Sequence, residues 1–152
     1  MKNLYVYDRD TGFILYSIDN ISDHQIQNLK NRNIPFIIAN RASLLNQYVV
    51  TANGIPSGFD TIKKQDILAD KQVIFSDGSD KIVFTGLASG TVVSIDGKQI
   101  WTSNTTDTSF AFSVNGYSTS NPVVRFQRYG YHKEQFQVIT MMPPQPIDSM
   151  VS

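Results

Sequence analysis

The stretch from Asp77 to Thr140 constrains the fold most, because short β-favouring runs alternate there with glycine-bearing turns. The runs are rich in valine, isoleucine and phenylalanine, which favour strands, and the turns contain Gly86, Gly90, Gly97 and Gly116. The successive runs are Lys81–Thr85, Thr91–Ile95, Lys98–Thr102, Ser109–Val114, Val123–Tyr129 and Phe136–Thr140. Strands of this length and spacing are typical of a small β-sandwich.

The N-terminal part of the chain predicts a smaller unit that combines strands with a helix. A hairpin is expected over Leu4–Ile18, since Gly12 can adopt the positive φ that closes such a loop. Ser22 and Gln25 have the spacing of a capping box, which predicts a short helix after them. We therefore predict an α+β domain over residues 1–70.

Further elements are expected in the second half of this domain. Ile34–Ala39 predicts a strand entered through a proline, which suits a sheet edge, and Gln47–Ala52 predicts a strand that runs into an Asn-Gly turn. Ile55–Phe59 contains a proline and a glycine and is expected to interrupt regular structure. Asp60 is expected to cap a short helical turn that continues to Asp66.

The sandwich is assigned to residues 71–140. The amino-acid composition changes after it. Residues 141–152 have three prolines within four positions, which prevents a central strand or a helix. Two alternatives remain: a frayed terminus, or an extended arm that becomes ordered on a neighbouring subunit. Methionines and an isoleucine favour the arm, because adaptable apolar side chains suit docking. The candidate partner-binding residues are Met141, Met142, Pro143, Pro144, Ile147 and Met150.

Composition excludes several classes of protein. The chain has no cysteine, so disulfides, thiolate metal sites and a cysteine nucleophile are ruled out. Its formal net charge is zero and no basic run is present, so neither nucleic acid nor an anionic membrane is an expected partner. No apolar stretch approaches the roughly 20 residues of a membrane span, and the N-terminus does not resemble a secretory signal. We therefore expect a soluble protein made in the cytoplasm.

No catalytic, cofactor or metal site is predicted from residue chemistry. The two histidines each lack a second ligand at zinc-binding spacing, and no Gly-x-Ser-x-Gly motif presents a serine nucleophile. The carboxylate pairs Asp77 with Asp80 and Asp8 with Asp10 lie among turn residues. Their side chains are expected to bond to the local backbone rather than to perform acid–base catalysis or bind a cation. We therefore predict that the protein is not an enzyme.

Aromatic residues of the sandwich divide into core and surface candidates. Phenylalanines 110 and 112 alternate along one run, which places both on one face of a strand and predicts that they face the core. Tyr129 and Tyr131 lie near a turn and are expected to be more exposed. Together with Trp101 they are candidate residues for binding a partner or a sugar.

Two parts of the sequence resemble small structural proteins from the tail and virion modules of tailed bacteriophages. Tyr5–Leu15 is similar to the Tyr-Val-Tyr-Asp hairpin with which many of these proteins begin. Ser76–Gly97 resembles their Asp-Gly-x-Asp strand and Gly-Leu-x-x-Gly-Thr-x-Val turn. As in that family, this segment leads towards a Gly-Tyr pair, Gly130-Tyr131, and a Phe-x-Val strand, Phe136–Val138.

The resemblance implies an immunoglobulin-like or transthyretin-like antiparallel sandwich in a non-enzymatic virion component made in the host cytoplasm. Residues 31–70 match no part of the family, and no catalytic or cofactor-binding residue comes with it. The expected function is that of a tail or baseplate adaptor, whose N-terminal domain docks to the particle and which holds or connects a fibre. Expected partners are other virion proteins and further copies in a symmetric homo-oligomer, with the arm buried on a neighbour.

Two alternatives to the adaptor remain open. A capsid decoration or head-fibre protein would use the same sandwich at another place on the particle. A host-polysaccharide-binding module would recognise sugars through Trp101, Tyr129 and Tyr131.

Overall fold

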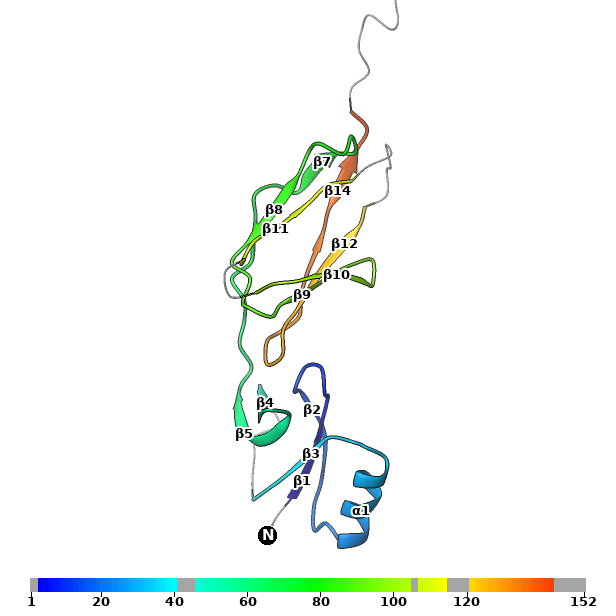
Figure 1. Cartoon of the computed structure of the whole chain (residues 1–152), viewed down its shortest axis with the longest axis vertical. Helices are drawn as coiled ribbons and strands as arrows, with labels where there is room; N and C mark the ends of the chain where they lie inside the picture. Colours follow the sequence, from blue (N-terminus) through cyan, green and yellow to red (C-terminus); the bar gives the residue numbers. More distant parts are fainter. Residues whose placement is uncertain (1–2, 41–45, 105–106, 115–120, 144–152) are drawn as a thin grey trace, which may run out of the picture. The chain divides into compact units, whose positions relative to one another are not determined.

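The computed structural model describes residues 3–40, 46–104, 107–114 and 121–143; these are mainly β, with one short helix among them (Figure 1). This confirms the predicted fold class. The chain forms two compact units, unit 1 (residues 1–64 and 128–132) and unit 2 (residues 65–127 and 133–152). The predicted boundary lay after residue 70, whereas the structure divides the chain after residue 64 and adds a second segment to unit 1.

Unit 1 contains a three-stranded antiparallel sheet with β1 (Asn3–Tyr7) between β2 (Ile14–Ile18) and β3 (Phe36–Ala39). The turn from β1 to β2 has the chemistry expected of its sequence. The Asp8 carboxylate accepts hydrogen bonds from two backbone N–H groups of the turn, and Gly12 has a φ of +77°. β3 lies at the sheet edge, as the proline before it predicted.

Helix α1 (Asp23–Asn31) begins at the predicted capping box. Ser22 Oγ accepts a hydrogen bond from the backbone N–H of Gln25, and the Gln25 side chain accepts one from the backbone N–H of Ser22. Leu29 is the buried residue of the helix and packs against β1. One face of the helix therefore closes the small core of unit 1.

A second hairpin in unit 1 joins β4 (Gln47–Ala52) to β5 (Ile55–Thr61) through the predicted Asn-Gly turn. The break predicted at Ile55–Phe59 is wrong. Pro56 pairs beside a register shift of the hairpin, where a missing N–H is tolerated, so the strand continues. The helical turn predicted over Asp60–Asp66 is also wrong, because β5 runs through the proposed cap.

Residues 128–132 belong to unit 1 through backbone hydrogen bonds. The N–H of Gly130 donates to the carbonyl of Thr11 in the β1–β2 turn, and the N–H of Lys63 donates to the carbonyl of Gly130. The N–H of His132 donates in turn to the carbonyl of Lys63. A Cβ at residue 130 would lie 2.6 Å from a tyrosine ring of β4, so glycine is required there.

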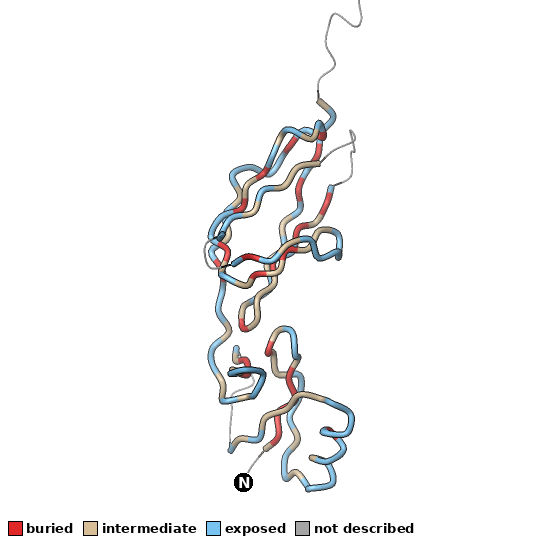
Figure 2. Tube along the Cα trace, in the orientation of Figure 1, coloured by how far each residue is buried: buried red, intermediate tan, exposed pale blue. Residues whose placement is uncertain are grey.

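Unit 2 is a sandwich of two antiparallel sheets. One has the order β10 (Lys98–Thr102), β9 (Val92–Ile95), β12 (Val123–Gln127), β13 (Glu134–Gln137), and the other β11 (Phe110–Phe112), β8 (Ile82–Thr85), β6 (Leu68–Ala69). Their inner faces share one core, which the buried stretches of these strands line (Figure 2). In this core the Phe84 ring lies 5.0 Å from the Phe126 ring and 5.3 Å from the Phe136 ring of the facing sheet.

A further two-stranded sheet of unit 2 is parallel. β7 (Val73–Phe75) pairs with β14 (Ile139–Met141), which follows β13 after a one-residue break. This departs from the all-antiparallel sandwich expected; parallel pairing is possible because the two strands are far apart in sequence. It also places Met141, predicted as the first residue of the arm, at the end of a strand, where its carbonyl accepts a hydrogen bond from the N–H of Ser76.

The Gly-Leu-x-x-Gly-Thr sequence forms a loop that is fixed by buried polar groups. Gln65 Oε1 accepts hydrogen bonds from Ala88 N (2.8 Å) and Thr91 Oγ1 (3.0 Å). The single Thr91 hydroxyl proton is shared between Gln65 Oε1 and the Ala88 carbonyl, and the Ser103 hydroxyl also donates to that carbonyl. Because the three side chains are buried, these hydrogen bonds are costly to lose. The motif therefore fastens the start of unit 2 to its sandwich.

Candidate partner-binding surface

Four apolar side chains form an exposed strip on the outer face of β7 and β14. Ile139 lies opposite Val73, and Met141 lies opposite Phe75. Each is 38–50% exposed, whereas the residues between them in the two strands are buried. We call these four residues the apolar strip. Met142, which is also exposed, follows it directly in the chain.

The apolar strip contrasts with the polar outward-facing positions of β12 and β13. Leu68 and Ile100 are further exposed apolar residues of unit 2. Arg125 of β12 and Gln135 and Gln137 of β13 are exposed and polar, as expected for a sheet face in contact with water. Contiguous exposed apolar side chains commonly mark interaction sites. Among the described residues of unit 2, the strip is therefore the strongest candidate for contact with another protein.

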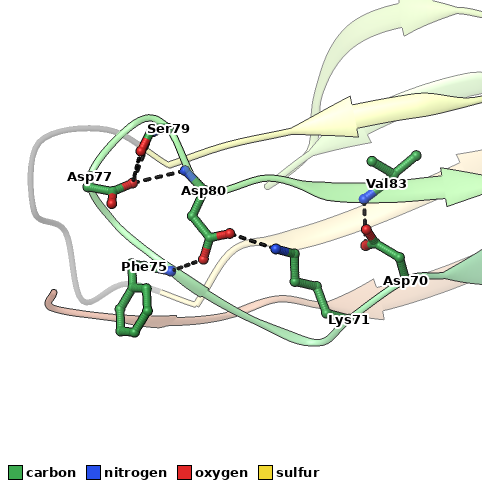
Figure 3. A network of polar contacts seen from close by, with 7 residues as sticks. All are labelled: Asp70, Lys71, Phe75, Asp77, Ser79, Asp80 and Val83. Atoms are coloured by element: carbon green, nitrogen blue, oxygen red, sulfur yellow. Dashed lines mark hydrogen bonds and ion pairs between the residues drawn. The ribbon is translucent and has the colours of Figure 1, made fainter.

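Side chains block both edges of the β7–β14 pair. The Asp80 carboxylate accepts a hydrogen bond from the N–H of Phe75 (2.8 Å) and forms an ion pair with Lys71 Nζ (2.6 Å) (Figure 3). On the other edge, Asn121 Oδ1 accepts a hydrogen bond from the N–H of Thr140 (3.1 Å). Such caps protect an edge strand from pairing with another strand. A partner would therefore pack on the side chains of the strip rather than add a strand.

The turn from Asp77 to Asp80 holds the first cap in place. Asp77 Oδ1 accepts hydrogen bonds from Ser79 N, Ser79 Oγ and Asp80 N (Figure 3). The backbone hydrogen bonds from Asp80 and Ser79 lower the pKa of Asp77. The hydrogen bond from Lys71, followed by that from the Phe75 backbone, lowers the pKa of Asp80. Both carboxylates bond to their own turn and its neighbours, as expected of this pair from the sequence.

Acid is expected to weaken unit 2 partly through Asp80. Because the pKa of Asp80 in the folded protein lies below its ordinary value of 3.8, its contribution to stability is complete above that value and is lost as the pH falls through the folded pKa. The Asp80→Asn variant lacks this contribution at every pH. Urea denaturation followed by Trp101 fluorescence should therefore separate wild type from Asp80→Asn at neutral pH, but not well below pH 3.8. The same separation at both pH values would contradict this role.

The predicted aromatic residues belong to two different units. Trp101 lies in β10 of unit 2, half-buried, with its ring 5.4 Å from the Phe110 ring. Tyr129 and Tyr131 belong to unit 1. The Tyr129 hydroxyl donates a hydrogen bond to the Val49 carbonyl, and burial raises the pKa of Tyr129. Trp101 and Tyr129 are therefore packing residues, which leaves Tyr131 as the more available of the three.

A polar cavity of about 400 Å³ opens beside Tyr131 in unit 1. Lys63 Nζ lies 5.9 Å from the centre of the Tyr131 ring, and Arg128 also lines the cavity. Nothing in the sequence pattern links residue 63 to residue 131, because the two meet only through long-range backbone pairing. The residues that line the cavity are Tyr48, Val50, Thr51, Lys63, Arg128, Tyr129 and Tyr131.

The predicted arm is described only at its start. Met141 is part of the apolar strip, Met142 is exposed and Pro143 is half-buried. Pro144, Ile147 and Met150 lie outside the described residues.

Within the described ranges, no group of three or more histidine, aspartate and glutamate residues could hold a metal ion. The same part of the chain contains no helix with both the length and the hydropathy needed to cross a membrane.

Neither a protein-family model nor a curated protein matches this chain. Among solved structures, a glycosyl hydrolase family 2 member from Bacteroides cellulosilyticus aligns with this chain at 14% sequence identity and a TM-score of 0.34. The alignment covers 91% of this chain and 21% of the glycosyl hydrolase chain. The chain thus spans about one fifth of that protein's length. A similarity this low supports no conclusion about fold or function.

Proposed function

We propose that this chain is a non-enzymatic structural component of a tailed-bacteriophage virion and that it docks to a neighbouring virion protein through the apolar strip. The strip is the observation that carries the proposal. One sheet face exposes four apolar side chains together, those of Val73, Phe75, Ile139 and Met141. Polar side chains would be expected on a face in contact with water. The sequence resemblance to tail and virion proteins supplies the kind of particle.

Within the particle, we assign the protein to the tail or baseplate, as an adaptor that holds or connects a fibre. Its partners are other virion proteins and neighbouring copies in a symmetric ring. The strip is followed in the sequence by Met142 and by residues 143–152, which include three prolines, Ile147 and Met150; such apolar side chains suit docking. A capsid decoration protein is the second candidate, because the same strip could dock to a capsid.

The caps on the strand edges define how docking occurs. Because Asp80 and Asn121 occupy the outward N–H groups of Phe75 and Thr140, the partner gains its contacts from side chains of the apolar strip. The strip alone is on the order of a few hundred Å², below the roughly 1,000 Å² of a stable interface. Stable attachment therefore requires additional contacts, and the C-terminal segment that follows the strip is in the right place in the sequence to supply them.

Charge on the apolar strip is expected to remove the protein from particles. Phe75→Asp combined with Ile139→Asp puts two carboxylates on the apolar strip. Docking would remove water from these carboxylates without giving them a compensating partner. In purified particles of the phage that encodes this double variant, we expect the content of the chain to fall at least about tenfold. Quantitative mass spectrometry of the particles measures the change.

A matched control separates docking from charge and from misfolding. Gln135→Asp combined with Gln137→Asp adds the same charge to an exposed polar face of β13 and should leave the particle content unchanged. Trp101 fluorescence should show that both double variants are folded. Wild-type content of the strip variant in particles would contradict docking through the strip.

A further inference from the structure

The polar cavity of unit 1 lies outside the apolar strip and has a chemistry of its own. We propose that it binds an acidic saccharide, with a sugar carboxylate held by Lys63 and Arg128 and a sugar ring packed on Tyr131. The described lining residues include these two cations and no carboxylate. A concave surface of this composition favours an anion. The inference does not depend on the virion assignment.

Charge is distributed unevenly between the two units, in the direction that the proposal requires. Unit 1 contains eight lysines and arginines against five aspartates and no glutamate. Unit 2 contains five lysines and arginines against eight aspartates and glutamates. The chain has zero net charge because a basic unit 1 is balanced by an acidic unit 2. The positive charge of unit 1 would attract an anionic ligand.

Backbone pairing holds the main chain at Lys63 beside that at Tyr131. The N–H of Lys63 donates to the carbonyl of Gly130 (3.0 Å), and the N–H of His132 donates to the carbonyl of Lys63 (2.8 Å). This parallel bridge places Lys63 beside Tyr131, with Nζ over the ring. A site built on paired backbone is preorganised, so binding costs less conformational entropy.

The lining favours a saccharide over an acidic peptide. A sugar ring presents an apolar C–H face together with hydroxyls, and the cavity offers a half-exposed aromatic ring at Tyr131 beside the hydroxyl of Thr51. Its volume of about 400 Å³ lies at the small end of the range for ligand pockets. An acidic peptide would use the cations but has no need of the aromatic face.

Isothermal titration calorimetry with trigalacturonic acid tests the proposal. We expect binding to the full-length protein that weakens as salt is raised, because the cations are near the surface. Lys63→Ala should weaken binding at least about tenfold, the loss expected for one charge-assisted contact. Alanine keeps both backbone hydrogen bonds of residue 63, so the variant should fold.

Lys64→Ala is the matched control, since Lys64 is the neighbouring lysine and does not line the cavity. It should bind as wild type does, and neutral maltotriose should bind neither protein measurably. Absence of trigalacturonic acid binding, or unchanged binding by Lys63→Ala, would overturn the proposal. A tetraglutamate peptide that binds as tightly as trigalacturonic acid would also overturn it and would reassign the cavity to acidic polypeptides.

Discussion

Phe84→Ala is expected to destabilise unit 2 by about 3–5 kcal/mol. Phe84 is 1% exposed, and its ring contacts those of Phe110, Phe126 and Phe136, which come from both sheets. Truncation would remove these contacts and leave a cavity between the sheets. Trp101 is the only tryptophan of the chain and packs on the same core, so its fluorescence during urea denaturation reports on unit 2.

Phe75→Ala provides the control in the same unit. Phe75 is 38% exposed on the apolar strip, so its truncation should cost less than about 1 kcal/mol. The same variant should weaken docking, which separates the role of the strip from that of the core. A loss of stability in Phe84→Ala no larger than in Phe75→Ala would contradict a core shared by the two sheets.

Gly86→Ala is expected to cost more than about 2 kcal/mol and to loosen the loop that fastens the start of the sandwich. Gly86 has a φ of +83°, where an L-residue is strained, and an added Cβ would lie 2.2 Å from the carbonyl oxygen of Asp66. That oxygen belongs to the backbone beside Gln65, so the collision cannot be relieved by rotating a side chain. Urea denaturation followed by Trp101 fluorescence measures the cost.

Gly97→Ala isolates the contribution of backbone strain. Gly97 has a φ of +85°, almost equal to that of Gly86, but no atom lies within 4 Å of the added Cβ. Gly97→Ala should therefore destabilise unit 2 by only about 1–2 kcal/mol, the cost of placing an alanine in the left-handed conformation. Equal losses in Gly86→Ala and Gly97→Ala would show that the contact with Asp66 is unimportant.

Elements determined by adjacent residues could be predicted from the sequence. The β1–β2 turn depends on Asp8 and Gly12, and the start of α1 depends on Ser22 and Gln25, all within a few positions of the atoms that they bond. The alternation of Phe110 and Phe112 likewise predicted that both face the core, and both pack against it. Local hydrogen bonding and strand periodicity carry this information.

Elements determined by distant partners could not be predicted. Lys63 suggested part of a helix, but its backbone is paired with residues 130 and 132. No local pattern shows that such a pairing exists, because the partners are separated by more than sixty positions.

The candidate surface was only partly predicted from the sequence. Met141 and Met142 were predicted as partner-binding residues, whereas Val73, Phe75 and Ile139 were not. Val73–Phe75 is apolar at every position, so alternation does not tell which side chains face outward. Only the parallel pairing of β7 with β14 brings the four residues together on one face.

Gold-labelled antibody imaging of purified particles, from the phage whose genome encodes this chain, tests the proposed virion role most directly. We expect label at the tail end of the particle, in agreement with a tail or baseplate adaptor. Label over the capsid would move the protein to the decoration alternative. Particles without any label would contradict a virion role altogether.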